Sequence, residues 1–362
     1  MDFDFTDDQV SLRDAVQRWV EKGFSFDRRH AVAKAGGWTR DVYRELAELG
    51  LTGLTVPGDR GGLGFGAVEA MVVMEELGRG LVNAPYAAAA LVAPTLLAQG
   101  DAAVQSAWLP RIADGSALVV LAQQERGARY QVDAPSTVAS QAAGGWALTG
   151  LKNLVPARVG PQAIGPVGLF LVERGRCTVR GYPTQDGARA ADVGLAAAPA
   201  SLVLADAGAA LELGLDVGIA AACAEGVGLM DRLLAITVEY MNTRKQFGVA
   251  IASFQALRHR IADVKMQLEL ARSMSYYATL KLGEPAPQRR RALSQAKVQL
   301  GQSMRFVGQQ CIQLHGGIGV TDEYIASHYF KRLTMLEVAW GDTLHHLGEV
   351  SDRMQDTAGV FA

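Results

Sequence analysis

Few of the residues that build metal centres or disulfide frameworks occur in this sequence. Only three of its 362 residues are cysteines, at positions 177, 223 and 311, and they form no Cys-x-x-Cys or Cys/His pair. This odd, scattered set argues against a disulfide framework and favours a reducing compartment. His328 and the pair His345–His346 have no carboxylate or cysteine at ligand spacing, so we expect surface or interface histidines. We therefore expect no metal and a cytoplasmic location.

The sequence also lacks an excess of one charge and a long hydrophobic run. Lysine plus arginine number 35 against 37 acidic residues, which argues against a nucleic-acid or anionic membrane partner. The longest nearly apolar run, residues 84–98, is short and is interrupted by Pro85 and Pro94, so we do not expect a continuous helix across a bilayer. The first five residues lack the basic flank and apolar core of a signal peptide.

What the sequence does contain is helical periodicity at both ends. Thr6-Asp-Asp-Gln9 is a capping-box pattern, and apolar residues at helical spacing follow it. After residue 213, apolar residues again recur at steps of three and four, in stripes long enough for a helix bundle. The most regular stripe comprises Phe254, Leu257, Ile261, Val264, Leu268, Ala271, Ser275, Ala278 and Leu282.

The middle of the chain has a different period. Leu118–Ala122, Trp146–Leu148, Val167–Val172 and Ser201–Leu204 are short apolar or alternating runs, separated by glycine and proline, as in antiparallel strands. The whole pattern predicts an α+β multidomain fold. We place an N-terminal all-α domain at residues 1–117, a middle antiparallel β domain at 118–208 and a C-terminal four-helix bundle at 209–362. Within the first domain, residues 51–56 are predicted to be an extended connector before a glycine-rich turn.

Two short segments suggest a binding site. Arg244-Lys-Gln-Phe-Gly248 follows one predicted helix, and Gln313-Leu-His-Gly-Gly-Ile-Gly319 follows another. Glycines placed after a helix end it in the left-handed conformation, and they let a backbone or a phosphate approach closely. A helix end and its turn would explain any one of these glycines. They do not explain the matching arginine segment at the end of a second long helix.

These segments resemble the acyl-CoA dehydrogenase family of flavoproteins, in which Arg-x-x-Phe-Gly and Gln-x-x-Gly-Gly-x-Gly jointly hold the diphosphate and adenosine of FAD. Val56–Gly64 and Glu75–Gly78 also match the family's pattern, so the resemblance covers nearly the whole chain. It implies the α–β–α order already predicted and FAD as the cofactor. The cofactor-binding residues that it implies are Arg244, Gln246, Phe247, Gln313, Gly316 and Gly317.

The resemblance also implies a reaction, the α,β-dehydrogenation of an acyl-CoA thioester, as in fatty acid or steroid degradation. A carboxylate removes the α-proton, and the flavin accepts the β-hydrogen as hydride. The family places its glutamate base at one of two positions, which are Trp340 and Gly218 here. Neither residue can accept a proton. Asp342 is the best remaining candidate for the base and Asp216 a weaker one, although misplacement by ~1 Å can cost ~10²-fold in rate.

The flavin-ring half of the site departs from the family as well. Where the family has an aromatic residue and a threonine against the ring, this chain has Leu154 and Pro156, and proline offers neither a hydroxyl nor an N–H group. The upstream flavin loop is represented only by Gln124-Glu-Arg-Gly-Ala-Arg129. The family's diphosphate half is therefore kept, whereas its ring half is altered.

This asymmetry is typical of a subunit that gives its diphosphate half to a neighbour's FAD. The chain resembles the small subunit of heteromeric bacterial acyl-CoA dehydrogenases that act on pimeloyl-CoA or steroid side-chain CoA esters. The resemblance implies a homologous large subunit that supplies the base, an acyl-CoA substrate and electron-transfer flavoprotein as the acceptor. Two alternatives stay open: a self-sufficient homotetramer with a displaced aspartate base, and a flavin-free scaffold protein with the same fold.

Overall fold

The protein is described by a computed structural model, which covers residues 4–131, 135–142, 145–155 and 167–354. The chain forms two compact units. One comprises residues 1–31, 67–82 and 219–362, and the other comprises residues 32–66 and 83–218.

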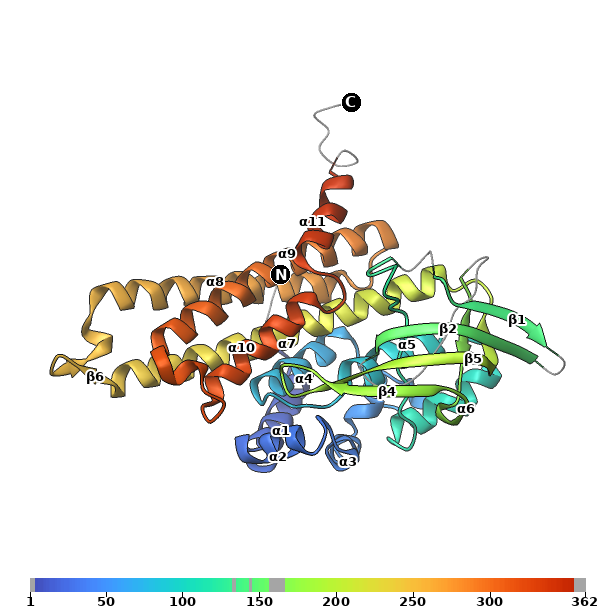
Figure 1. Cartoon of the computed structure of the whole chain (residues 1–362), viewed down its shortest axis with the longest axis horizontal. Helices are drawn as coiled ribbons and strands as arrows, with labels where there is room; N and C mark the ends of the chain where they lie inside the picture. Colours follow the sequence, from blue (N-terminus) through green and yellow to red (C-terminus); the bar gives the residue numbers. More distant parts are fainter. Residues whose placement is uncertain (1–3, 132–134, 143–144, 156–166, 355–362) are drawn as a thin grey trace. The chain divides into compact units, whose positions relative to one another are not determined.

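Apart from a short hairpin at residues 245–250, the first unit is built of helices (Figure 1). In chain order they are α1 (Asp7–Gly23), α2 (Phe26–Lys34), α4 (Ala67–Arg79), α7 (Gly208–Thr243), α8 (Gln255–Lys281), α9 (Ala286–His315), α10 (Ile325–Val338) and α11 (Thr343–Asp352), of which α2 and α7 extend into the second unit. The predicted capping box is present: the Thr6 hydroxyl accepts from the backbone N–H of Gln9, and the Gln9 side chain accepts from the N–H of Thr6.

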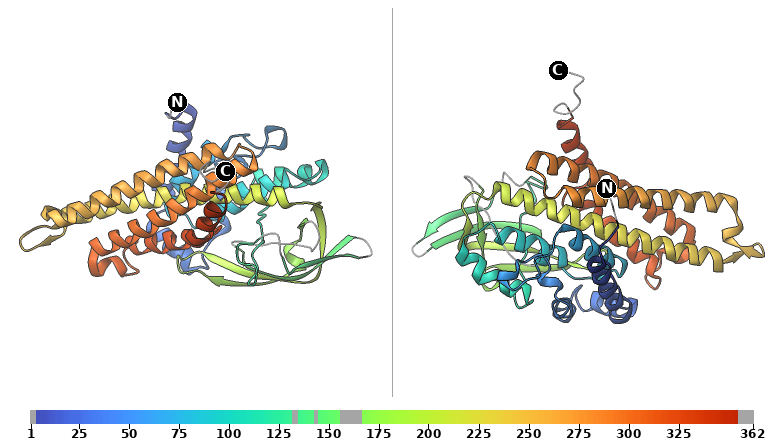
Figure 2. Two further views of the ribbon diagram at one scale, coloured as in Figure 1. Left: turned by 90° about the horizontal axis from the view of Figure 1, so that it is seen from above. Right: turned by 180° about the vertical axis from the view of Figure 1, so that it is seen from behind.

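The core of this unit consists of the periodic faces predicted from the sequence. Val264, Leu268, Ala271, Ser275 and Ala278 of α8 are all buried, and they belong to a face that packs against α7, α9 and α10. Figure 2 shows α8 and α9 side by side along their length. Burial of these stripes stabilises the bundle by about 25 cal/mol per Å² of apolar surface removed from water.

Two glycines let helices α4 and α7 cross in backbone contact. A Cβ on Gly228 would lie 1.9 Å from the Glu75 carbonyl oxygen, and one on Gly78 would lie 2.3 Å from the Glu225 carbonyl oxygen. Any side chain at either position would force the helices apart, so close packing of this crossing requires glycine on both.

The second unit joins short helices to an antiparallel sheet. Its helices are α3 (Arg40–Glu48), the 3₁₀ turns η1 (Leu51–Gly53) and η2 (Gly58–Arg60), a π-helix (Ala87–Val92) that continues as α5 (Ala93–Leu97), and α6 (Ala102–Ala113). Its strands are β1 (Val138–Ala142), β2 (Gly145–Val155), β3 (Leu169–Leu171), β4 (Thr178–Pro183) and β5 (Arg189–Leu204). The long strand β5 pairs with β2, β3 and β4, and β1 pairs with β2.

Two local predictions for this unit were wrong. Residues 118–122 are not a strand, although Val120 and Ala122 are buried in the core of this unit. Residues 51–53 form a 3₁₀ turn, and residues 54–56 continue as turn and bend rather than as an extended connector. The run from residue 87 to 97 is helical across Pro94, as a π-helix followed by α5, but it is too short to cross a bilayer.

Helix α7 has an apolar window long enough to cross a bilayer, with a mean hydropathy of 1.5. However, 89% of that window is buried inside the protein, as expected for a core helix. Its length and composition therefore do not indicate a membrane span.

Candidate functional site

The arginine segment forms a tight hairpin at the C-terminal end of α7. Strands β6 (Lys245–Gln246) and β7 (Val249–Ala250) pair with Gln246 opposite Val249, so Phe247 and Gly248 form a two-residue turn. Both turn residues have positive φ, 54° and 84°, as a type I′ turn requires. Figure 1 shows this hairpin at one end of the bundle. The side chain of Phe247 is 92% exposed, and Arg244 is exposed too.

The glycine segment ends α9 and continues as a 3₁₀ turn, η6 (Gly316–Val320). Gly316 has φ 64° and ψ −143°, a conformation that is essentially restricted to glycine. A Cβ on Gly316 or Gly317 would meet no atom within 4 Å, so the backbone of both residues is open to an incoming group. Gln313 is exposed on the last turn of α9.

The structure brings these two segments together. The ring of His315 lies 4.7 Å from that of Tyr240 and 5.2 Å from that of Tyr324, measured between centroids. Leu314 packs with Met241 and Ile251 in a small apolar cluster, against which Tyr240 also packs. Arg244 follows Tyr240 by four residues and Gln313 precedes His315 by two, so the predicted residues belong to the two segments that this contact joins. We name this region, residues 240–251 with 313–324, the bundle tip.

His315 is a part of the bundle tip that the sequence reasoning did not identify. It is 2% exposed, and its Nδ1 atom lies 2.8 Å from the Cys311 carbonyl oxygen, to which it donates. Its Nε2 atom has no hydrogen-bond partner within the described residues. Burial lowers the pKa of His315, so the ring is neutral and Nε2 is an acceptor. A histidine next to a glycine pair at a helix end was the only available sequence signal.

The groups exposed at the bundle tip fit the diphosphate and adenosine half of FAD. The C-terminal end of a helix carries partial negative charge, so α9 by itself disfavours an anion. Positive charge must therefore come from side chains, and the exposed Arg244 has a guanidinium that matches phosphate geometry. Gln313 offers an amide, and Gly316 and Gly317 offer an uncovered backbone.

The position of the family's base lies in a different place, in the turn between α10 and α11. Trp340 has φ 60° there and packs partly buried against the bundle core. The buried Lys297 of α9 donates to the carbonyl oxygens of Leu336, Glu337 and Gly341 at 3.0, 2.8 and 2.8 Å. Nε2 of His346 lies 2.9 Å from the Trp340 carbonyl oxygen. The turn is thus fixed from α9 and α11, and its conformation presents an indole instead of a carboxylate.

Asp342 has a structural use in this turn. Its carboxylate accepts from the backbone N–H of His345 at 2.8 Å and is the N-cap of α11. Gly218, at the family's other base position, is buried within α7, and so is Asp216. The base assignment to Asp342 stays a prediction. Glu225 is 8% exposed and accepts from Arg332 at 2.6 and 2.9 Å, as expected of a buried hydrogen-bonding group.

The bundle tip and the Trp340 turn lie at different positions along α9. Lys297, which contacts the turn, precedes His315 by 18 residues of one helix, a separation of about 27 Å at ~1.5 Å per residue. The residues expected to hold the diphosphate and those expected beside the reacting carbon are therefore far apart within one chain.

On the ring side, the second unit has a saturated polar cluster. Glu125 accepts from Lys152 at 2.5 Å and from the backbone N–H groups of Ser136 and Thr137 at 2.7 and 3.1 Å. Burial would raise the pKa of Glu125, but hydrogen bonds from Lys152, Ser136 and Thr137 outweigh burial and lower the pKa to about 2. The charges of Glu125 and Lys152 are paired with each other, so neither is available to bind a ligand.

The same side offers little to a flavin ring. Asn153 donates to Asp192 at 2.9 Å, and the Tyr182 hydroxyl donates to the same carboxylate at 3.2 Å. Leu154 is 49% exposed with φ 51°, and it presents only an aliphatic side chain. Pro156 lies outside the described residues. On this side, the described part of the chain does not supply the hydroxyl and aromatic contacts that the resemblance implies for the ring.

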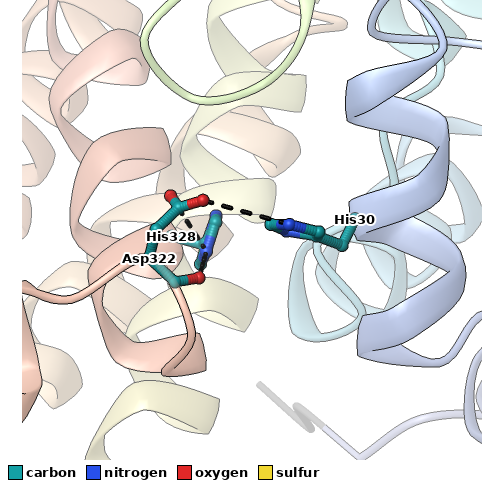
Figure 3. Close-up of side chains that lie close together, drawn as sticks. All are labelled: His30, Asp322 and His328. Atoms are coloured by element: carbon teal, nitrogen blue, oxygen red, sulfur yellow. Dashed lines mark hydrogen bonds and ion pairs between the residues drawn. The ribbon is translucent and has the colours of Figure 1, made fainter.

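His30, Asp322 and His328 form the only group within the described residues with metal-ligand composition and spacing (Figure 3). However, Nδ1 of His328 lies 2.9 Å from a guanidinium nitrogen of Arg29, which can only donate. Nε2 of His328 must then carry the proton that it donates to the Asp322 carbonyl oxygen at 2.8 Å. This tautomer leaves no lone pair for a metal. Contrary to the prediction, His328 and His346 are buried, 5% and 1% exposed, because both are used in internal hydrogen bonds.

Comparisons with known proteins match most of the chain to one family. Residues 6–116 match the acyl-CoA dehydrogenase N-terminal domain, and residues 208–355 match the acyl-CoA dehydrogenase C-terminal domain. Acyl-CoA dehydrogenase IpdE2 of Mycobacterium tuberculosis is 30% identical over 84% of this chain and 83% of its own. A solved structure described as the Tcur3481-Tcur3483 steroid ACAD G363A variant has a TM-score of 0.88 at 29% identity, covering 98% and 99% of the two chains. The ChsE4-ChsE5 complex of Mycobacterium tuberculosis has a TM-score of 0.90 at 24% identity, covering 99% and 100%, which establishes a shared fold.

Proposed function

Because the chain belongs to the acyl-CoA dehydrogenase family, FAD-dependent oxidoreductases of the CH–CH group of acyl-CoA thioesters, we propose that it is a donor subunit. Its bundle tip holds the diphosphate and adenosine of an FAD whose ring and catalytic base belong to a homologous partner subunit. The observation that carries this proposal is that the bundle tip keeps an exposed cation and an open glycine backbone, whereas the turn at the base position presents Trp340 instead of a carboxylate.

The exposure of the bundle tip supports this function. Phe247 is 92% exposed and Val320 is 71% exposed, and the cation Arg244 is exposed as well. An exposed cation together with exposed apolar side chains is suited to a surface that a partner and its bound diphosphate cover together. We assign Arg244 to the diphosphate, Gln313 and the backbone of Gly316 and Gly317 to hydrogen bonds with it, and Gln246 and Phe247 to the adenosine end.

The ring side supports the same division of labour. Glu125 and Lys152 are bound to each other, and Trp340 and Gly218 offer no base. When FAD is bound, it supplies the acceptor for the β-hydrogen. The base that removes the α-proton is then the partner's. This chain's contribution is to neutralise the diphosphate and to fix its position.

The relatives guide the choice of partner and substrate. The two solved structures named above carry two chain names each, and one is described as a steroid enzyme. We infer a heterotetramer with a homologous large subunit, and an acyl-CoA of the steroid side-chain or a related class as substrate. Electron-transfer flavoprotein is the proposed acceptor and the cytoplasm the proposed location. The domain boundaries at residues 117 and 208 also stay a prediction.

The test is the amount of flavin bound per chain. We expect the isolated chain to purify without flavin, and co-expression with the homologous large subunit to give one FAD per pair of chains. Arg244→Ala should lower the FAD affinity of the complex at least tenfold, by removing a charge-assisted hydrogen bond of about 1.5–3 kcal/mol. The matched control is Arg44→Ala, an arginine with a side chain 62% exposed in α3 of the other unit.

Two outcomes would refute the donor role. One is full flavin occupancy and turnover in the isolated chain, which would make it a self-sufficient enzyme. The other is a colourless complex with the partner present, which would indicate a flavin-free scaffold. Equal loss of flavin in the Arg244 and Arg44 variants would show that Arg244 acts only through general stability.

A further inference from the structure

The open glycines of the bundle tip belong to a loop that is closed at its base. The rings of His315, before the loop, and Tyr324, after it, lie 5.2 Å apart between centroids. The first part of the loop packs back on α9: a Cβ on the buried Gly319 would lie 2.9 Å from the Ile312 carbonyl oxygen. We name residues 316–323 the glycine loop. Its first part is held by α9, so its order depends on what holds its far end.

A buried histidine of α10 holds the far end of the glycine loop. The Nε2 atom of His328 donates to the backbone carbonyl oxygen of Asp322 at 2.8 Å (Figure 3). On the other side of the ring, Nδ1 accepts from a guanidinium nitrogen of Arg29 in α2 at 2.9 Å. Phe26, one turn earlier on α2, contacts the same ring at 5.1 Å between centroids. His328 therefore connects α2 to the main chain of the loop.

Only a neutral histidine can make both hydrogen bonds. A guanidinium can only donate, so Nδ1 of His328 must keep its lone pair and Nε2 must carry the proton. Burial lowers the pKa of His328, and the positive charges of Arg29 and Lys331 act in the same direction, whereas the hydrogen bond to Asp322 opposes them. The neutral form, and with it the connection, is therefore kept at neutral pH.

The carboxylate of Asp322 holds the loop less firmly than its carbonyl group does. This side chain is 59% exposed, and it lies 2.9 Å from Lys331, 3.6 Å from His328 and 4.0 Å from His30. Exposed ion pairs of this kind contribute little, because water and salt screen them. The bond from His328 is made inside the protein and fixes the main chain itself.

We propose that His328 is a positioning residue for the flavin site, which keeps the glycine loop ordered before FAD arrives. This inference rests on the proposed function of the bundle tip. Being buried, His328 acts through the loop and not by contact with the ligand. A loop released at its far end would have to be ordered again on binding, and this entropic cost would lower the affinity of Gly316 and Gly317 for the diphosphate.

Two amide substitutions separate the two hydrogen bonds of His328. Asparagine ends at the level of Nδ1, so it can accept from Arg29 but is too short to donate to Asp322. Glutamine extends to the level of Nε2 and can donate there. In the isolated chain, His328→Asn should speed hydrogen exchange of the backbone amides of residues 316–323 by about tenfold, and His328→Gln should restore most of the protection.

The consequence for flavin is measured in the complex with the homologous large subunit. His328→Asn should weaken FAD binding by about tenfold, as expected when roughly one residue of backbone must be ordered again on binding. His328→Gln should weaken it by less than about threefold. Phe26→Ala, which removes the ring contact that holds His328 in place, should have an intermediate effect on both measurements and serves as the second variant if His328→Asn does not fold.

Two controls separate positioning from general stability. Ser303→Ala removes a buried hydroxyl that donates to Gln267, and thus a link between α9 and α8. It should lower the Tm and leave exchange in residues 316–323 and FAD affinity unchanged. Lys331→Met removes the ion pair with the Asp322 carboxylate and should also leave both unchanged.

Several results would overturn the role of His328. One is unchanged exchange of the glycine loop in His328→Asn, and another is equal acceleration in the asparagine, glutamine and Ser303 variants. Faster exchange with unchanged FAD affinity would also overturn it. A wild-type complex without flavin would instead refute the donor role, and with it the flavin role of His328. The exchange measured in the isolated chain would still show whether His328 orders the loop.

Discussion

His346 is a neutral histidine held inside the Trp340 turn. Its Nδ1 atom is 3.2 Å from the Ser294 hydroxyl, and its Nε2 atom is next to the Trp340 carbonyl oxygen. Burial, together with the nearby charges of Lys297 and Arg290, lowers the pKa of His346 to about 3. The folded protein therefore does not take up this proton at mildly acidic pH, whereas the unfolded chain does.

The sign of the pH effect follows from this difference. Above pH ~6.5 both states are neutral, and the contribution to stability is complete. Between pH ~6.5 and 3 only the unfolded state binds the proton, so the free energy of unfolding decreases as the pH is lowered. From pH 7 to 5 the loss from His346 should be about 2 kcal/mol. Urea unfolding of the wild type and of His346→Gln should show a loss smaller by this amount in the variant. Equal losses in the two proteins would contradict a strongly lowered pKa for His346.

Asp342 offers a second test at the scale of one residue. If its carboxylate only caps α11, Asp342→Asn should leave turnover of the complex unchanged, because asparagine is an equally good N-cap. Asp342→Ala should then cost about 1 kcal/mol of stability. A fall in kcat of ~10²-fold or more for Asp342→Asn would instead identify Asp342 as a general base, in favour of the self-sufficient enzyme.

At the scale of elements, Lys297 joins α9 to the end of α10. Its ammonium group satisfies three carbonyl oxygens that α10 and the following turn leave without helical partners. Lys297→Met keeps a side chain of similar size but removes the hydrogen bonds to these three carbonyl oxygens. The free energy of unfolding should fall on the order of 3 kcal/mol, measured by urea denaturation at neutral pH. The exposed Lys22 of α1 is the control, and Lys22→Met should cost less than about 1 kcal/mol.

The elements also show what a local pattern can and cannot predict. The stripe from Val264 to Ala278 predicted α8 correctly, because a helix buries side chains at its own period. The run at residues 118–122 was read as a strand because it is apolar. An apolar segment can be buried without being a strand, as Val120 and Ala122 are. The strands of this unit that pair with β5 are β2, β3 and β4, and residues 118–122 are not among them. Likewise, Arg29 and His328 are 299 residues apart, so no local signal could reveal that His328 is buried.

The candidate site was predictable in part for the same reason. Arg244, Gln313 and the glycines could be predicted because each belongs to a short segment whose residue types and spacing are visible in the sequence. His315 and Lys297 were missed, since their importance comes from contacts: an acceptor without a partner among the described residues, and three carbonyl oxygens from distant turns.

At the scale of the whole molecule, cofactor binding should depend on the assembly. A ligand that binds only the folded complex stabilises it by about 2.7 kcal/mol at 100 times its Kd. Added FAD should therefore raise the Tm of the complex by a few degrees and leave that of the isolated chain unchanged. Thermal unfolding monitored by tryptophan fluorescence measures both. A comparable rise for the isolated chain would contradict an FAD site shared between subunits.

The turn at Phe247 and Gly248 has a kinetic consequence. With its strained φ of 54° already adopted by Phe247 in the single chain, the hairpin pays its conformational cost before any encounter. Docking then orders few additional torsions. Association should accordingly proceed at the rate of rigid-body collisions, sensitive to ionic strength through Arg244, rather than wait for a loop to rearrange.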